Sequence, residues 1–191
     1  MKKILAGCAM ILGAISLSSC FTPTGDNAHE QRSYAKDVAS STLTELYKKD
    51  SKAQKLVENS SGYVVYNSYA VDYFFITTEN GWGIAVDNKT GQQTVLKDLS
   101  IGIGPGLGVA EMRTVLVFDN PIDFSTFVNG GWGFNAKADA VARFTPDGTW
   151  DIAGETNFVN GARVYKIGER GLIAEAAIDV SKSWKNASLA E

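Results

Sequence analysis

Cys20 is the residue whose type and surroundings point most directly to chemistry. Leu17, Ser18 and Ser19 precede it, so that a large apolar residue and two small ones lead to a cysteine, as in the bacterial lipobox. Small side chains let the backbone enter a peptidase cleft, and the thiol is the nucleophile that would form a thioether to diacylglycerol. The pattern predicts cleavage before Cys20 and lipidation of this residue with chains such as palmitate.

The segment before Cys20 has the layout of a signal peptide. Lys2 and Lys3 give it a positive start, and an apolar stretch follows from Ile4 to Leu17. This stretch is shorter than the roughly 20 apolar residues of a transmembrane helix. We therefore expect residues 1–19 to be a lipoprotein signal peptide, the alternative being an ordinary secretory signal followed by a coincidental cysteine.

The predicted lipidation of Cys20 indicates where in the cell the protein is expected. Because two or more acyl chains hold a protein stably on a membrane, the mature chain is expected to be anchored in the cell envelope. Phe21 follows the cysteine, where an aspartate would be a cue for inner-membrane retention. The expected location in a source with two membranes is the outer membrane, facing the periplasm.

Four lysines lie close together: Lys48, Lys49, Lys52 and Lys55. On a helix, the first, third and fourth of them fall at i, i+4 and i+7, which is one face. They form either a solvated face or a surface for lipid phosphates, where each lysine near an anionic leaflet adds about 1 kcal/mol. They are the candidate lipid-binding residues.

Glycine alternates with other residues at Gly102, Gly104, Gly106 and Gly108. The spacing does not match G-x-G-x-x-G before a helix, and no Gly-Lys-Ser/Thr follows as in a P-loop. An extended segment with this pattern lacks side chains on one face, so that other atoms approach closely. It predicts either a bend packed against a helix or a tryptophan, or the floor of a groove for an acyl chain.

Composition excludes several other functions. The formal net charge is −3, and it becomes more negative when Lys2 and Lys3 leave with the signal, which argues against nucleic-acid binding. His29 is the single histidine and falls in a polar segment, so neither a zinc site nor histidine-based catalysis is expected. We predict no cofactor, no metal and no enzymatic activity. A hydrolase would have to use the scattered carboxylates Glu111, Asp139, Asp151 and Glu155.

The chain divides into a tether, a helical segment and a strand-rich segment. Residues 20–32 are polar and predict a flexible tether, and residues 33–59 have a helical pattern with a break at Asp50. A short helix capped by Asn120 interrupts the strands, and Asn160-Gly161 predicts a hairpin. The predicted strands are Tyr63–Asn67, Tyr73–Thr78, Gly83–Asp87, Gln93–Leu96, Val109–Phe118, Phe134–Phe144, Trp150–Phe158, Ala162–Ile167 and Leu172–Val180.

These elements predict an α+β fold. N-terminal helices pack on a mainly antiparallel sheet, open or curled into a barrel-like shape, with one inserted short helix. A single domain is expected over residues 33–185, followed by a tail over 186–191. Gly81-Trp82-Gly83 and Gly131-Trp132-Gly133 are each expected to open a strand, as two independent strand starts or as a pseudo-symmetric pair.

A series of short motifs in a fixed order covers nearly the whole mature chain, from about Ala35 to Trp184. Because these motifs occur in this order, the chain resembles the SYLF domain family. The motifs are Gly62-Tyr63-Val64-Val65-Tyr66, Gly104-Pro105-Gly106-Leu107-Gly108, Arg113–Phe118, Gly131-Trp132-Gly133-Phe134 with Ala136–Ala140, and Val164–Ile167 through Gly171-Leu172 to Trp184. The chain differs from the family at Asn67, where proline is common, and near Tyr73, where Asp72-Tyr73-Phe74-Phe75-Ile76 replaces a glycine-rich run.

The resemblance implies a lipid-binding module. Eukaryotic members bind phosphoinositides through basic, amphipathic N-terminal helical sequence, fungal members are also associated with actin, and bacterial members are often lipoproteins. It favours a non-enzymatic domain that binds membrane phospholipid through the Lys48–Lys55 region. The alternative is a protein-interaction or structural module of the cell envelope, for which lipid supplies only the location.

Overall fold

The computed structural model describes residues 22–130, 133–135, 143–144, 150–151, 157–159, 161–168 and 178–189. Cys20 and the signal segment lie outside these residues. Within the part of the chain that is described, no helix is both long enough and apolar enough to cross a bilayer.

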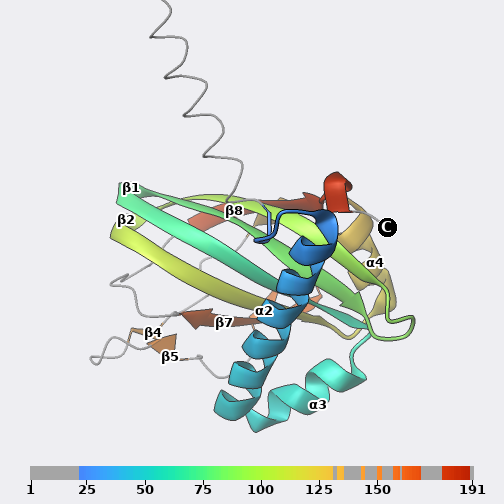
Figure 1. Cartoon of the computed structure of the whole chain (residues 1–191). Helices are drawn as coiled ribbons and strands as arrows, with labels where there is room; N and C mark the ends of the chain where they lie inside the picture. The colour runs from blue at the N-terminus through green and yellow to red at the C-terminus, as the bar shows by residue number, and fades with distance from the viewer. Residues whose placement is uncertain are drawn as a thin grey trace, which may run out of the picture.

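Two helices at the N-terminus cover one side of a sheet, and a third helix lies at its end (Figure 1). Asn27 caps the first helix by accepting a hydrogen bond from the Glu30 backbone N–H, and Asp50 caps the second through the Lys52 N–H. The Asn120 side chain likewise accepts from Ile122 N at 2.9 Å. The helices are α2 (Ala28–Lys49), α3 (Ser51–Asn59) and α4 (Pro121–Gly130).

The sheet is antiparallel and is built around two strands of 26 residues each. They pair with each other, while the first half of β2 also pairs with β8 and its second half with β7. The sheet has six strands and is not closed into a barrel among the described residues. The strands are β1 (Gly62–Asp87), β2 (Gln93–Phe118), β3 (Gly133–Asn135), β6 (Asn157–Val159), β7 (Ala162–Gly168) and β8 (Ile178–Lys185), and a separate pair is formed by β4 (Arg143–Phe144) and β5 (Trp150–Asp151).

The β1–β2 ribbon folds back on itself near Phe74. A Cβ on Gly81 would lie 2.5 Å from the Asn67 carbonyl oxygen, and a Cβ on Gly83 would lie 2.5 Å from the Tyr66 ring. Asn67 and Gly81 are each seven residues from Phe74, and Tyr66 and Gly83 are eight and nine residues from it, so the two halves of β1 cross each other closely. Figure 1 shows both strands turning back at its left edge.

The folded sheet has two buried faces. The outer face is covered by α2 and α3 and includes Trp82, Ile84 and Val115. The inner face is closed at one end by α4, where Phe118 packs against Phe124 and Phe127 with ring centroids 5.7 Å and 5.1 Å apart. Together these layers bury an ordinary apolar core.

The structure confirms the α+β class, the antiparallel sheet, the inserted helix and the hairpin at Gly161, where Val159 pairs with Ala162. The barrel-like alternative is wrong, because the described strands do not close. The division into short strands is also wrong. Tyr63–Asn67, Tyr73–Thr78 and Gly83–Asp87 are parts of β1, and Gln93–Leu96 and Val109–Phe118 are parts of β2.

The chain ends also differ from expectation. Helix α2 begins at Ala28 instead of Ser33, which places His29, exposed, on its first turn. Asn186 and Leu189, which were expected to belong to a tail, are buried. Gly81-Trp82-Gly83 lies inside β1 and does not open a strand, whereas Gly131 and Trp132 fall outside the described residues.

The crossing within β1 predicts that Gly81→Ala is strongly destabilising. The new methyl group would meet backbone atoms of Asn67 and Ser68, which cannot rotate away, so we expect the free energy of unfolding to fall by about 1–3 kcal/mol. Urea denaturation measures this change. Gly91→Ala is the control, because its φ of 72° disfavours alanine but its Cβ would meet open space. A smaller loss at Gly81 than at Gly91 would contradict the crossing.

Candidate functional site

The bend of the ribbon is irregular on both strands. Phe74 pairs with Gly106 and Ile76 with Ile103, which leaves Phe75 opposite two residues of β2 as a bulge. Phe74 has a φ of 58°, a left-handed conformation that is uncommon for an aromatic residue. The bend therefore departs from regular strand geometry and turns several consecutive side chains outward.

The side chains at the bend are apolar and exposed. The exposed fractions are 67% for Tyr73, 59% for Phe74, 69% for Phe75 and 56% for Ile76. The Tyr73 and Phe74 rings meet edge to face with centroids 5.0 Å apart. We call these four residues the apolar tip; Tyr69, Val71, Ile101 and Val109 are exposed beside it.

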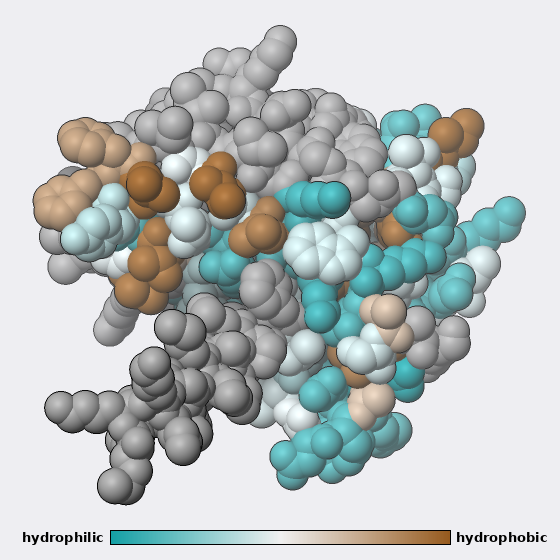
Figure 2. Space-filling view, turned by 90° about the horizontal axis from the view of Figure 1, so that it is seen from above, coloured by the Kyte–Doolittle hydropathy of each residue, from teal (hydrophilic) through white to brown (hydrophobic). Residues whose placement is uncertain are grey.

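Strand alternation explains why the tip is uncovered. Val65 on β1 and Val115 and Val117 on β2 point to the outer face and are buried in the cluster formed with α2 and α3. Tyr69 and Val71 have the same orientation but are more than 40% exposed. Helices α2 and α3 therefore cover the outer face around Val65 but do not extend as far as the bend. In Figure 2 the apolar surface gathers at one edge of the molecule, on the left.

The inner face behind the tip is polar. Tyr66 donates a hydrogen bond from its hydroxyl to Ser183 Oγ at 2.7 Å, and Ser183 donates to Asp98 Oδ1 at 2.7 Å. Burial raises the pKa of Tyr66 well above its ordinary value; the negative charge of Asp98 adds to this and the Ser183 contact opposes it. The Tyr66 hydroxyl therefore remains a donor at neutral pH. Ser68 also hydrogen-bonds to Glu79 on this face.

Asp72 lies directly before the tip and is only 2% exposed. Both of its carboxylate oxygens are buried, and no hydrogen-bond partner for them exists among the described residues. An unpaired buried carboxylate is costly, because water no longer solvates it and nothing replaces the water. The tip is therefore attached to a segment that is not optimised for stability.

Replacing Asp72 with asparagine is expected to stabilise the fold. Loss of the buried charge at nearly constant shape should raise the free energy of unfolding by about 1–3 kcal/mol. Chemical denaturation of the variant measures the change, and the control is Asp37→Asn at an exposed position of α2, expected within about 0.5 kcal/mol of the parent. A destabilised Asp72→Asn variant would show that the carboxylate has a stabilising partner.

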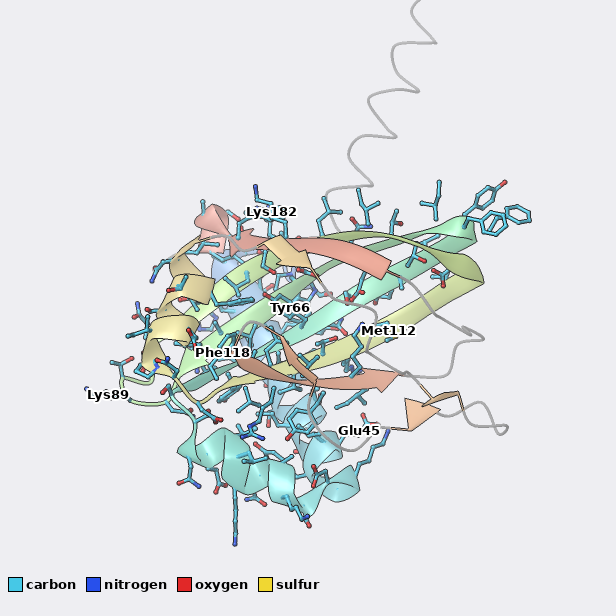
Figure 3. All side chains as sticks on the ribbon, turned by 180° about the vertical axis from the view of Figure 1, so that it is seen from behind. Glu45, Tyr66, Lys89, Met112, Phe118 and Lys182 are labelled. Carbon is cyan, nitrogen blue, oxygen red and sulfur yellow. The ribbon has the colours of Figure 1, made fainter. Side chains whose placement is uncertain are left out.

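The four candidate lysines are all exposed, but they belong to two helices that meet at Asp50. Lys48 and Lys49 end α2, while Lys52 and Lys55 lie in α3. Lys49 forms an ion pair with Glu45 at 3.0 Å. Figure 3 labels Glu45 near this junction, at the bottom of the molecule, whereas the bend lies at the upper right.

The alternating glycines lie in β2 at the bend itself. Gly102 pairs with Thr77, Gly106 with Phe74 and Gly108 with Asp72, while Gly104 lies within the bulge. Gly108 has a φ of 155°, which glycine adopts readily. The structure thus brings the glycine run to the backbone of the apolar tip, a juxtaposition that the sequence did not reveal. The sequence signals for this site were the unbroken apolar run from Tyr73 to Ile76 and the separate run of alternating glycines.

The described residues hold no cluster of three or more His, Cys, Asp or Glu side chains that would suit a metal ion. Glu111 forms an ion pair with Arg113 at 3.8 Å on an outward-facing position. The side chains of the other candidate carboxylates, Asp139, Asp151 and Glu155, lie outside the described residues. The apolar tip is therefore the feature of the described surface that calls for a functional explanation.

Fold and site define an α+β protein with a folded antiparallel ribbon, helices on its outer face and an exposed apolar tip. A protein of Aeromonas veronii named "Beta cell expansion factor A" is 30% identical to this chain over 164 residues. The similarity covers 86% of this chain and 60% of that protein, so the chain spans less than two thirds of the length of its relative. No family model matches the chain.

Proposed function

We propose that this protein is a lipid-anchored member of the cell envelope whose SYLF-like domain binds phospholipid bilayers without catalysing a reaction. Support for the SYLF assignment comes from the ordered motifs between Gly62 and Trp184. Mass spectrometry of the mature protein tests the anchor. The expected N-terminal residue is a diacylated or triacylated Cys20.

The apolar tip is the observation that carries the bilayer proposal. Monomeric soluble proteins rarely expose a contiguous apolar patch without a partner. Transfer of each tip side chain from water into a bilayer interface would contribute about 1–2 kcal/mol, given that each is already partly buried. Tyrosine is also suited to the headgroup region, because its ring is apolar and its hydroxyl is polar.

This mode of binding suits an acidic protein. The formal net charge of −3 gives no general attraction to anionic lipid, but insertion of aromatic side chains does not depend on charge. A lipidated Cys20 would keep the domain at a high effective concentration beside the bilayer.

Substitution of the tip should abolish binding to vesicles without unfolding the protein. We expect Phe75→Ser combined with Ile76→Ser to weaken co-sedimentation of the unacylated mature chain with phosphatidylcholine vesicles by about a hundredfold, at about tenfold for each side chain. Ile122→Ser is the matched control, because Ile122 is 70% exposed on α4, far from the tip. Its binding should equal that of the parent.

Equal binding by the tip variant and the parent would refute insertion of the tip. The alternative function, a protein-interaction module of the envelope, has a distinct signature. The unacylated parent would then show no affinity for vesicles of any composition, and crosslinking through a group placed at the tip would recover one defined envelope protein. The soluble domain therefore decides between the two functions, because acyl chains alone would hold the native protein on a membrane.

A further inference from the structure

The inner face of β1 closes into a loop behind the apolar tip. The Ser68 hydroxyl, which is fully buried, donates a hydrogen bond to Glu79 Oε1, although the two residues are 11 positions apart. Between them the strand turns at Phe74 and comes back. The two arms of this loop start together at the turn and meet again at the Ser68–Glu79 hydrogen bond. They therefore enclose a narrow corner on the inner face.

Strand alternation points two further polar side chains into this corner. Asp72 is 2% exposed while its neighbour Val71 is 41% exposed, so Asp72 points inward on the first arm. Thr77 is 4% exposed while its neighbour Ile76 is 56% exposed, so Thr77 points inward on the second arm. Asp72 and Thr77 are the inward positions nearest to the turn on their arms, and they share the corner with Glu79.

The corner contains two carboxylates and no described cation. Both oxygens of Asp72 are buried without a hydrogen-bond partner among the described residues. The ion pairs given for the described part of the chain include neither Asp72 nor Glu79. The positions of β2 that pair with Asp72 and Thr77 are Gly108 and Gly102, which add no side chain to the corner. A bound ion is one of the ways in which such a buried group is satisfied.

We propose that this corner binds a calcium ion between the carboxylates of Asp72 and Glu79, with the Thr77 hydroxyl as a further oxygen ligand. Ca²⁺ takes about 6–8 oxygen ligands in flexible geometry, so backbone carbonyls and water would complete its shell. Mg²⁺ demands a nearly regular octahedron and suits an irregular, bulged strand less well. The expectation of no metal rested on the scarcity of histidine and cysteine, which are ligands of zinc and are not needed for calcium.

The ion would compensate the buried charge of Asp72 and tie the two arms of the loop together. With only two carboxylates, its affinity should be that of weak extracellular calcium sites, for which dissociation constants are about 10⁻⁴–10⁻³ M. The site is independent of the proposed bilayer contact, because neither the lipid anchor nor the apolar tip supplies a ligand. Its tests are therefore carried out without lipid.

Thermal unfolding of the mature-length chain with Cys20→Ser tests the site, in EDTA and in calcium chloride at equal ionic strength. Calcium at about 10 mM, which is about a hundredfold above the lower of these dissociation constants, should raise the unfolding temperature of the parent by about 5–10 °C. Asp72→Asn should show no such rise. In EDTA this variant should unfold at a temperature no lower than that of the parent, because its buried charge is gone. Its missing response would then not be a folding defect.

Two further variants separate the corner from general binding of ions to an acidic surface. Glu79→Gln keeps an oxygen that accepts the Ser68 hydrogen bond but loses the charge, so its dissociation constant for calcium should rise about tenfold or more. Asp37→Asn removes the same charge from an exposed position of α2 and should respond to calcium as the parent does. An equal calcium response of the parent and Asp72→Asn, or no response of the parent, would overturn the proposal.

Equilibrium dialysis with radioactive calcium measures occupancy directly. The parent should bind one ion per chain that Asp72→Asn does not bind, and this comparison remains valid if the variants differ in stability. Methylammonium chloride is the competing probe for the buried carboxylate. If methylammonium stabilised the parent and calcium did not, the metal assignment would be wrong and the corner would be a site for an organic amine.

Discussion

The close crossing of the two halves of β1 is the constraint on which the rest of the structure depends. Two 26-residue strands would form a ribbon far too long to bury both faces. Gly81 and Gly83 allow the ribbon to fold in half, because any side chain there would collide with Asn67 or Tyr66. The fold brings the outer residues Val65, Trp82 and Ile84 into one cluster under α2, and it leaves Phe74 exposed at the bend.

The same geometry leaves the two ends of the sheet covered to different extents. At one end of the sheet, α4 closes the inner face with aromatic packing, and α2 and α3 cover the outer face. At the other end, no residue of these two clusters covers the outer face, where Tyr69 and Val71 are exposed. The inner face carries Asp72, which has no partner among the described residues, and the outer face carries the tip. A segment with an unpaired buried carboxylate and exposed apolar side chains stabilises the isolated domain poorly.

Local signals predicted much of the fold but not its central feature. Caps at Asp50 and Asn120 and the turn at Gly161 are short-range devices, so the sequence revealed them. Gly81-Trp82-Gly83 resembles a strand start, because glycine usually interrupts strands. Its actual role, a close crossing with residues about 14 positions earlier, is a tertiary contact without a local signature.

The candidate site, too, was only partly predictable from the sequence. The run from Tyr73 to Ile76 has the composition of a buried strand, and only the extent of the helical cover makes it exposed. The sequence signal for the site was the unbroken run of bulky apolar residues from Tyr73 to Ile76. The lysines were found by their spacing, but the sequence could not show that they are divided between the end of α2 and helix α3.

Insertion of the tip into a bilayer is tested most directly by measuring its depth. From residue 20 onward the sequence contains no cysteine other than Cys20, so Cys20→Ser in a protein that begins there allows a single labelling site at Phe75→Cys or, as a reference, Ile122→Cys. An environment-sensitive fluorophore at position 75 should shift to the blue on vesicles and be quenched by lipids spin-labelled near the headgroup and upper acyl chain, whereas position 122 should remain in water. Identical, water-like signals at both positions on vesicles that bind the protein would contradict insertion of the tip.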